Sequence, residues 1–337
     1  MSKKAPPDHP QVEHGRIGVL LINLGTPDAP EAGAVRRYLA QFLTDPRVIE
    51  ISPWLWRPIL HGIVLRLRPR KSAHAYRQVW TDQGSPLAAI TRRQADALQE
   101  RLGEDVIVDY AMRYGNPAIG PAVERMAKAG CDRILAAPLY PQYCAATTAS
   151  AQDALFAALA SLRRQPAVRT LPPYYDDPLH LDALAQSLKS QLEALDFTPD
   201  RLLLSFHGMP QRTLELGDPY HCHCQKTARL LGERLAVPTD IAFQSRFGRA
   251  QWLKPATDEI LAGYPERKVT RIAIAAPGFS ADCVETLEEL GIRGRDTFLA
   301  AGGERFERLD CLNDSAEGMA MLEALVRREL AGWLLPE

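Results

Sequence analysis

The chain has 337 residues, of which 46% are hydrophobic and 24% are charged, and its length indicates about two domains. These fractions are typical of globular domains and exclude a disordered, collagen-like or coiled-coil chain. Lys and Arg total 40 against 41 Asp and Glu, so the net charge of −1 gives no general attraction for nucleic acid. A small-molecule partner is therefore expected, and no nucleic acid.

Cysteine usage and hydropathy predict a cytoplasmic protein. The six cysteines are scattered, and a core of this size does not need disulfides, which indicates a reducing compartment. Residues 1–15 are polar and contain no apolar stretch of signal-peptide length. The most apolar segment, 54–67, is interrupted by two arginines, a proline and a histidine, so it falls short of the ~20 apolar residues of a spanning helix.

Short apolar runs of strand length alternate with longer segments of helical periodicity. We expect strands at 19–23, 106–110, 133–137, 202–206 and 271–275, and helices at 92–102 and 179–195. Strands buried on both faces read as continuous apolar runs, as these do. The alternation predicts an α/β fold with parallel sheets.

Pairs of short motifs recur in the same order in the two halves of the chain. Each pair joins similar residues: x-Gly-x-Pro after a strand at 24–27 and 207–210, Arg-aromatic-Gly at 113–115 and 246–248, and an Arg-led apolar strand ending in Pro at 133–138 and 271–277. This order predicts an internal duplication, although Gly and Pro also punctuate strand ends in any α/β protein. Ligands of open α/β sheets bind beyond the carboxyl ends of the strands, so we expect the site in a cleft between the halves.

The expected domain boundary lies in a proline-rich stretch, 165–178. We place an N-terminal half at 16–165 and a C-terminal half at 166–314. A C-terminal helix at 315–335 is expected to pack back on the first half.

A histidine and a row of carboxylates carry the candidate chemistry. His207 ends a predicted strand, and its imidazole can take a proton or bind a metal; a structural histidine held by a backbone partner is the alternative. Asp282, Glu285 and Glu289 fall at i, i+3 and i+7 of a predicted helix, which would align them on one face. Such a row needs solvent, a cation or protons, and a solvated surface helix is the alternative.

Two further segments have open interpretations. Leu55, Ile59, Ile63 and Leu67 recur at every fourth position among arginines, which suits a core-facing helix, a lip for a large flat ligand, or contact with a membrane surface. The tract His221-Cys222-His223-Cys224 has adjacent spacing that does not suit a tetrahedral metal site, and its role stays open.

Five motifs in combination resemble the ferrochelatase family. They are LINLGTP at 21–27, YPQY at 140–143, SFHGMP at 205–210, FQSRFG at 243–248 and PGFSADCVETLEE at 277–289. The resemblance spans about residues 16–313 and is greatest to proteobacterial members, which carry a Trp-rich segment like that at 54–70. It implies two Rossmann-like, chelatase-type domains related by pseudo-symmetry. It also implies an enzyme that inserts Fe²⁺ into protoporphyrin IX and releases two protons, the last step of haem synthesis.

The resemblance also implies the site residues. The metal-site and catalytic residues map onto His207 and Glu285, and we suggest Asp282 and Glu289 as a path for protons or iron. The positions implied to contact the porphyrin are Leu24, Arg68, Tyr76, Ser85, Arg113, Tyr114, Tyr140 and Trp252. Cys283 stands where some relatives have His, so that residue's role is not carried over.

The resemblance leaves cofactor, location and exact activity as expectations. No [2Fe–2S] cluster is expected, because Ala145 replaces the internal Cys ligand of animal members and the chain ends at Glu337 without their extension. No permanently bound cofactor is expected, and peripheral contact with the inner membrane would use the segment from Trp54 to Leu67. The alternatives are a porphyrin or haem carrier without turnover, or a chelatase for another metal or for coproporphyrin III.

Overall fold

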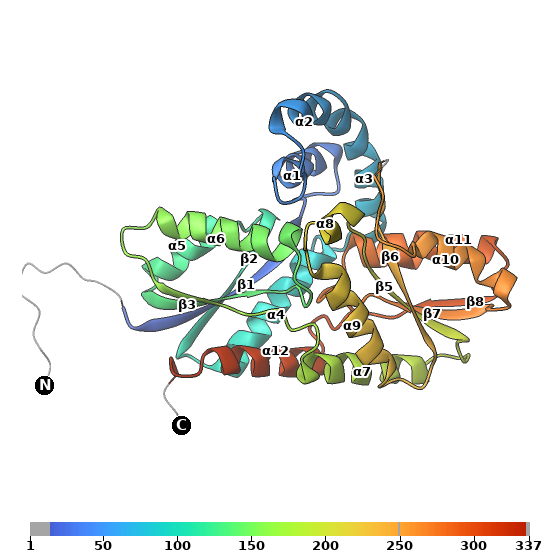
Figure 1. The fold of residues 1–337 in the computed structure, drawn as a ribbon. Helices are drawn as coiled ribbons and strands as arrows, with labels where there is room; N and C mark the ends of the chain where they lie inside the picture. Colours follow the sequence, from blue (N-terminus) through green and yellow to red (C-terminus); the bar gives the residue numbers. More distant parts are fainter. Residues whose placement is uncertain (1–13, 249, 335–337) are drawn as a thin grey trace, which may run out of the picture.

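Each half of the chain forms a four-stranded parallel sheet, and the two sheets lie side by side (Figure 1). The computed structural model describes residues 14–248 and 250–334, so most of the polar run 1–15 and the end of the expected helix 315–335 lie outside it. The first sheet has the order β2-β1-β3-β4, with β1 (Arg16–Thr26), β2 (Val106–Gly115), β3 (Cys131–Pro138) and β4 (Ala167–Thr170). The second has the order β6-β5-β7-β8, with β5 (Arg201–His207), β6 (Thr239–Gln244), β7 (Arg271–Ala275) and β8 (Arg305–Arg308).

Helices connect the parallel strands, as parallel pairing requires. The first half contains α1 (Ala32–Thr44), α2 (Pro53–Ile59), the π-helix η1 (Leu60–Val64), α3 (Leu65–Val79), α4 (Pro86–Leu102), α5 (Ile119–Lys128), the π-helix η2 (Ala145–Ala149) and α6 (Ser150–Ala160). The second contains α7 (Pro178–Glu193), α8 (Gln211–Glu215), α9 (Tyr220–Gly232), α10 (Thr257–Gly263), the 3₁₀ turn η3 (Pro265–Arg267), the π-helix η4 (Glu285–Gly294) and α11 (Arg295–Ala300). The C-terminal helix is α12 (Ala316–Glu329).

The shared strand order confirms the predicted duplication. Each half places its first strand beside its second and third strands, in parallel. The five expected strands are β1, β2, β3, β5 and β7. The expected strands did not include β4, β6 and β8, which lack a long buried apolar run: β4 and β8 have four residues each and none is buried, and β6 is buried only in its second half.

A glycine allows equivalent close approaches of backbone in the two halves. A Cβ on Gly25 would collide with the carbonyl oxygen of Tyr114, and a Cβ on Gly208 would collide with that of Gln244. Gly25 also has a φ of 108°, which side chains rarely adopt. The glycine of the first Gly-x-Pro motif thus lets the end of β1 approach β2 closely, and the glycine of the second lets the end of β5 approach β6.

The boundary between the halves differs from the expected division at 165/166. β4 belongs to the first sheet, so that half extends at least to Thr170, and the second half begins with α7. The proline-rich stretch 165–178 connects the two sheets, but its first part forms strand β4. α12 lies along α4 and α7, and therefore touches both halves (Figure 1).

Polar side chains on α4 bind the two halves together. Gln94 donates from Nε2 to the carbonyl oxygens of Ser280 at 3.1 Å and Asn313 at 2.8 Å. The preceding residue, Arg93, donates to both carboxylate oxygens of Asp314 at 2.7 and 2.9 Å. These contacts hold the carboxyl ends of both sheets in a fixed relation.

His180 of α7 is buried near this contact, and neither of its ring nitrogens has a hydrogen-bond partner within residues 14–248 and 250–334. Its ring meets Tyr174 edge-on, with centroids 5.2 Å apart. Burial lowers the pKa of His180 from 6.5 to about 4, although the nearby Asp177 opposes the shift. The protein therefore folds with this histidine neutral.

We predict that His180 makes the fold sensitive to acid. The stability that depends on a neutral His180 is fully present above pH 6.5. The free energy of unfolding then decreases as the pH falls toward 4, because only the unfolded chain binds the proton in this window. The loss amounts to about 3 kcal/mol. His180→Leu should reduce the decrease in unfolding free energy between pH 7 and pH 4.5, measured with urea. A variant at the exposed His74, His74→Gln, should leave that decrease unchanged; an equal effect of both variants would contradict the prediction.

Candidate active site

His207 lies at the carboxyl end of β5 and is partly exposed, as the sequence predicted. Its Nδ1 lies 2.7 Å from the carbonyl oxygen of Gly208. A carbonyl only accepts hydrogen bonds, so Nδ1 carries the proton, and in the neutral ring the lone pair is on Nε2. The backbone partner that would mark a structural histidine thus leaves the other nitrogen available to take a proton or to bind a metal.

Gln244 connects the strand of His207 to the helix that begins with Glu285. In the parallel ladder His207 is paired with Gln244. The Gln244 side chain donates from Nε2 to the Glu285 carbonyl oxygen at 3.0 Å. The structure therefore brings the two residues of the expected metal pair to opposite sides of one glutamine, although they are 78 positions apart in the sequence.

Glu285 and Glu289 lie on the π-helix η4, and both are partly exposed. Burial, together with the Glu285 carboxylate, raises the pKa of the Cys283 thiol well above its usual value. Glu289 is held more firmly, because Ser245 donates to it from the backbone N–H at 2.8 Å and from Oγ at 2.5 Å.

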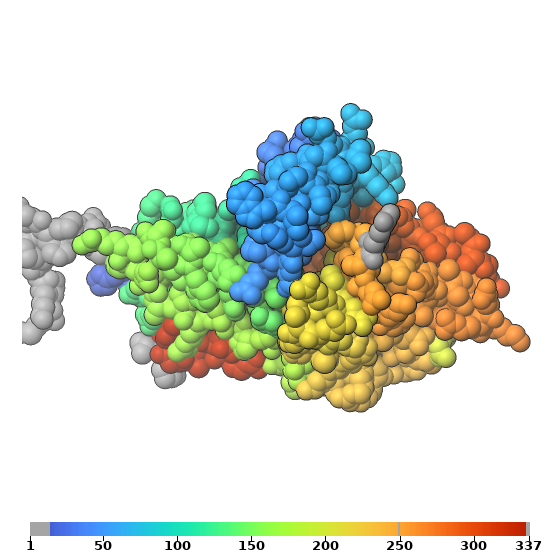
Figure 2. All heavy atoms as spheres, turned by 45° about the horizontal axis from the view of Figure 1, so that its top comes forward, coloured from blue at the N-terminus to red at the C-terminus, as the bar shows by residue number. Residues whose placement is uncertain are grey.

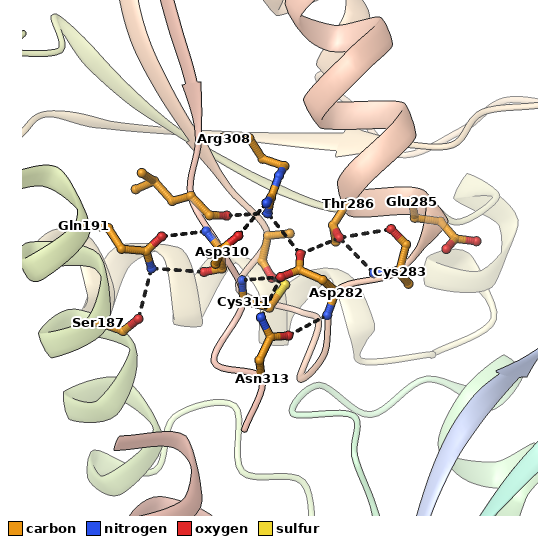
Figure 3. Close-up of polar contacts among 12 residues, drawn as sticks. Ser187, Gln191, Asp282, Cys283, Glu285, Thr286, Arg308, Asp310, Cys311 and Asn313 are labelled. Carbon is orange, nitrogen blue, oxygen red and sulfur yellow. Dashed lines mark hydrogen bonds and ion pairs between the residues drawn. The ribbon is translucent and has the colours of Figure 1, made fainter. Parts of the chain in front are cut away.

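Asp282 does not share a helical face with these two carboxylates, contrary to the expected row. It lies before η4 and is buried, with its carboxylate 3.0 Å from the Arg308 guanidinium. Asn313 Nδ2 donates to it at 2.7 Å and the Thr286 hydroxyl at 2.7 Å. Figure 3 shows the Glu285 side chain directed away from this network. The alignment was derived for an α-helix starting earlier in the chain, and the local fold uses Asp282 as a buried ion-pair partner.

A cluster of tyrosines in the first half faces Glu285. Tyr38 of α1 and Tyr76 of α3 are buried, and burial followed by the neighbouring charges, Glu285 among them, raises both pKa values well above the usual range. These phenols stay protonated and act as neutral donors. Tyr140 belongs to the same cluster, and its buried hydroxyl has no hydrogen-bond partner in the part of the chain that the structure describes. Sequence reasoning missed Tyr38, because a buried aromatic on a helix carries no signal of its own.

Arg113 and Tyr114 extend from β2 into a buried polar network around Asp45. Arg113 Nη2 donates to Asp45 at 2.5 Å, and the hydroxyls of Tyr114 and Ser150 lie 2.8 and 2.6 Å from the same oxygen. Burial alone would raise the pKa of Asp45, but these hydrogen bonds and the Arg113 charge lower it. Both expected porphyrin-contacting residues are thus fixed by the carboxylate.

The remaining expected porphyrin residues surround the junction of the halves. The Arg68 guanidinium of α3 lies over the Phe247 ring of the second half at 4.9 Å, and burial lowers the pKa of Arg68. Trp252 packs on Phe247 with centroids 5.1 Å apart and donates from Nε1 to its carbonyl oxygen. Leu24 and Ser85 lie in the first half, at the end of β1 and just before α4.

The segment at 51–67 forms a lip that stands above the junction of the halves (Figure 2). The four-residue stripe faces solvent: Leu55, Ile59, Ile63 and Leu67 are exposed, as are Ile51 and Trp54. The adjacent stripe faces the core, with Leu60 buried and Trp56 Nε1 donating to the Leu43 carbonyl oxygen. The core-facing interpretation of the first stripe is therefore wrong. In the π-helix η1 each hydrogen bond spans one residue more than in an α-helix, which keeps side chains at every fourth position on one face.

The His-Cys-His-Cys tract lies on α9 and is used for packing. His223 stacks on Tyr175 at 3.6 Å, and His221 stacks on Phe243 at 5.6 Å. Cys224 is buried and Cys222 is exposed. Within residues 14–248 and 250–334, no three His, Cys, Asp or Glu side chains are arranged to hold a metal ion.

Comparisons with known proteins agree on one family. The model of the family described as Ferrochelatase matches residues 16–330. The chain is 52% identical over 334 residues to a protein named ferrochelatase from Rhizobium meliloti (strain 1021), covering 97% of this chain and 98% of that protein. A ferrochelatase from Mesorhizobium japonicum is 50% identical over 333 residues, covering 97% of this chain and 94% of that protein.

Solved chelatase structures share the fold at low sequence identity. SirB from Bacillus subtilis, described with Fe³⁺, has a TM-score of 0.57 at 13% identity, covering 94% of this chain and 96% of that one. CbiX, described as the terminal enzyme of sirohaem biosynthesis in denitrifying bacteria, has a TM-score of 0.51 at 16% identity, covering 93% and 100%. These likenesses support the duplicated two-sheet architecture.

We predict that Asp282 is needed mainly for stability. Asp282→Asn would leave the buried Arg308 charge without its main partner, so the free energy of unfolding should fall by about 3–5 kcal/mol. Asp310, the exposed partner of the same guanidinium, provides the control: Asp310→Asn should cost less than about 1 kcal/mol. Urea unfolding of both variants is the measurement, and equal losses would contradict the assignment.

Proposed function

The chain belongs to the ferrochelatase family and is an enzyme that inserts Fe²⁺ into protoporphyrin IX as the last step of haem synthesis, and we propose that it does so between His207 and Glu285. The observation that carries this assignment is the position of Gln244, which is paired with His207 and hydrogen-bonded to Glu285. His207 is thus the ladder partner of Gln244, and the Glu285 backbone is hydrogen-bonded to the Gln244 side chain, so both residues adjoin the same glutamine.

Metal insertion requires the porphyrin to lose two N–H protons while four nitrogens bind iron. The ring must bend so that nitrogen lone pairs become available, and a cleft that holds a bent ring favours the transition state. His207 Nε2 is available to accept a proton, because Nδ1 is bound to the Gly208 carbonyl oxygen. Glu285 supplies an oxygen that can bind hydrated Fe²⁺ and release it, or pass a proton onward.

The expected porphyrin-contacting residues offer flat apolar surface and two kinds of polar group. The Tyr140 hydroxyl is buried and has no hydrogen-bond partner among the described residues, so it is a polar group that the surrounding protein leaves unsatisfied. Arg68 and the start of α4 beside Ser85 are positive and would suit the propionates. Of the two residues expected on the path for protons or iron, we retain Glu289. We exclude Asp282, because Arg308 and Asn313 already bind its carboxylate oxygens.

The lip suits a membrane surface. Trp54 and Leu67 are 89% and 71% exposed, and Arg57, Arg66, Arg70 and Lys71 flank the apolar face. An apolar face with basic flanks binds anionic bilayers by burial and by charge. No helix in the part of the chain that the structure describes is long and apolar enough to cross a bilayer. We place the protein in the cytoplasm, with peripheral attachment to the inner membrane through this lip.

No resident cofactor is part of this proposal, and iron enters only as substrate. Ala145, which replaces a cluster ligand of animal relatives, begins η2 and donates its N–H to Asp218. The neighbouring Cys144 is buried, and burial raises the pKa of its thiol, which disfavours the thiolate that a metal would require.

We predict that His207→Ala and Glu285→Gln bind protoporphyrin but form haem at least about 100-fold more slowly, because each removes a group that handles a proton or iron. Anaerobic assays with Fe²⁺ would follow porphyrin fluorescence and the haem spectrum. Glu288→Gln is the matched control on the same helix, since Arg293 already occupies both Glu288 oxygens. Wild-type protein that binds porphyrin without metallating it would instead indicate a carrier.

We predict that the lip mediates membrane binding. The double variant Trp54→Ser and Leu55→Ser should reduce co-sedimentation with phosphatidylglycerol-containing vesicles by about tenfold, because it removes exposed apolar area. High salt should weaken the wild-type binding, because the flanking charges are screened. Phe156→Ser, which alters an exposed aromatic on α6 away from the lip, should bind as the wild type does. Equal loss in both variants would count against the lip.

A further inference from the structure

Gln244 is a buried amide whose hydrogen-bonding groups are used by two different elements. Its Nε2 donates to the Glu285 carbonyl oxygen at 3.0 Å, which fixes the orientation of the amide. Its Oε1 accepts from the Ser205 hydroxyl at 2.8 Å, and that hydroxyl is bound to Thr257 at 2.8 Å. The side chain therefore cannot rotate without breaking bonds to β5 and to η4.

The backbone of Gln244 is fixed as firmly as its side chain. The Gly208 N–H donates to the Gln244 carbonyl oxygen at 2.8 Å, in the space that only glycine at 208 leaves open. The ladder pairs Gln244 with His207. One residue thus has its main chain bound to the strand of the histidine and its side chain bound to the helix of the glutamate.

The next residue binds the following turn of η4. Ser245 has a left-handed φ of 65°, an unusual conformation for a residue with a side chain. In this conformation its N–H donates to one oxygen of Glu289 and its Oγ to the other. Residues with a strained backbone that specific hydrogen bonds hold in place cluster at functional sites.

We propose that Gln244 is a positioning residue for metal insertion, which sets Glu285 relative to His207 while Ser245 fixes Glu289 on the same helix. The inference rests on the proposed roles of His207 and Glu285. Displacing a reacting group by about 1 Å can reduce turnover about 100-fold, so loss of this tether should be visible in kcat. Gln244 is buried at the end of a strand pair, so substrate binding does not require it.

The test compares Gln244→Met, which keeps length and volume without donors, with Gln244→Glu. In Gln244→Met, kcat for Fe²⁺ insertion should fall about 10-fold to 100-fold, with KM for protoporphyrin within about twofold of the wild type. A Glu at this position donates to the Glu285 carbonyl oxygen only when protonated. The kcat of Gln244→Glu relative to wild type should therefore approach 1 at low pH and fall as pH rises, whereas the Gln244→Met ratio stays constant.

The matched control is Thr257→Val, which removes the outer hydroxyl of the same hydrogen-bonded chain but leaves the contact of Gln244 with Glu285. It should lose some thermal stability and keep kcat within about twofold. The proposal is overturned if Gln244→Met turns over like the wild type, if Thr257→Val loses as much kcat, or if the Gln244→Glu ratio does not change with pH. Should Gln244→Met fail to fold, the pH profile of Gln244→Glu decides.

Failure of the proposed function would give a different pattern. Normal turnover by His207→Ala and Glu285→Gln would remove the metal pair itself, whatever Gln244 does. Inactive His207→Ala and Glu285→Gln beside a fully active Gln244→Met would keep the metal pair and reject only the positioning role.

Discussion

The close approach of β5 to β6 at Gly208 is the constraint on which the site depends. Any side chain at 208 would collide with the Gln244 carbonyl oxygen. The chain just after His207 can therefore approach β6 only because Gly208 has no Cβ. That pairing places Gln244 beside His207, and Gln244 in turn reaches Glu285. The same solution occurs at Gly25 and Tyr114 in the first half, but there the corner supports aromatic surface in place of the proposed metal pair.

The duplicated halves have taken different chemical tasks. The first half supplies tyrosines kept neutral by burial, together with Arg113 held by buried Asp45. The second half supplies the imidazole and the carboxylates. Contacts from α4 to Ser280, Asn313 and Asp314 hold these two surfaces together. In the proposed function, the second half supplies the acid–base groups and the first half supplies aromatic surface.

Buried ion pairs at the margins of the site serve as framework. Asp282 with Arg308 and Asp45 with Arg113 each bury a carboxylate that is satisfied by further hydrogen bonds. Breaking such pairs is costly, because the remaining charge stays buried without a partner. Glu285, by contrast, is only partly buried, which suits its proposed exchange of protons or metal.

The sequence by itself determined the α/β class, the duplication, the central strands and His207 at a strand end, because apolar runs and Gly-Pro punctuation are local patterns. Its motifs also indicated the family, and the family comparisons confirm it. Tertiary structure decided the rest. Asp282 is a buried ion-pair partner because Arg308, 26 residues away, meets its carboxylate, whereas the carboxylate of Glu285 stays partly exposed. The positions of Tyr38 and Gln244 in the site likewise depend on tertiary structure, since burial and long-range contacts produce no periodic pattern in the sequence.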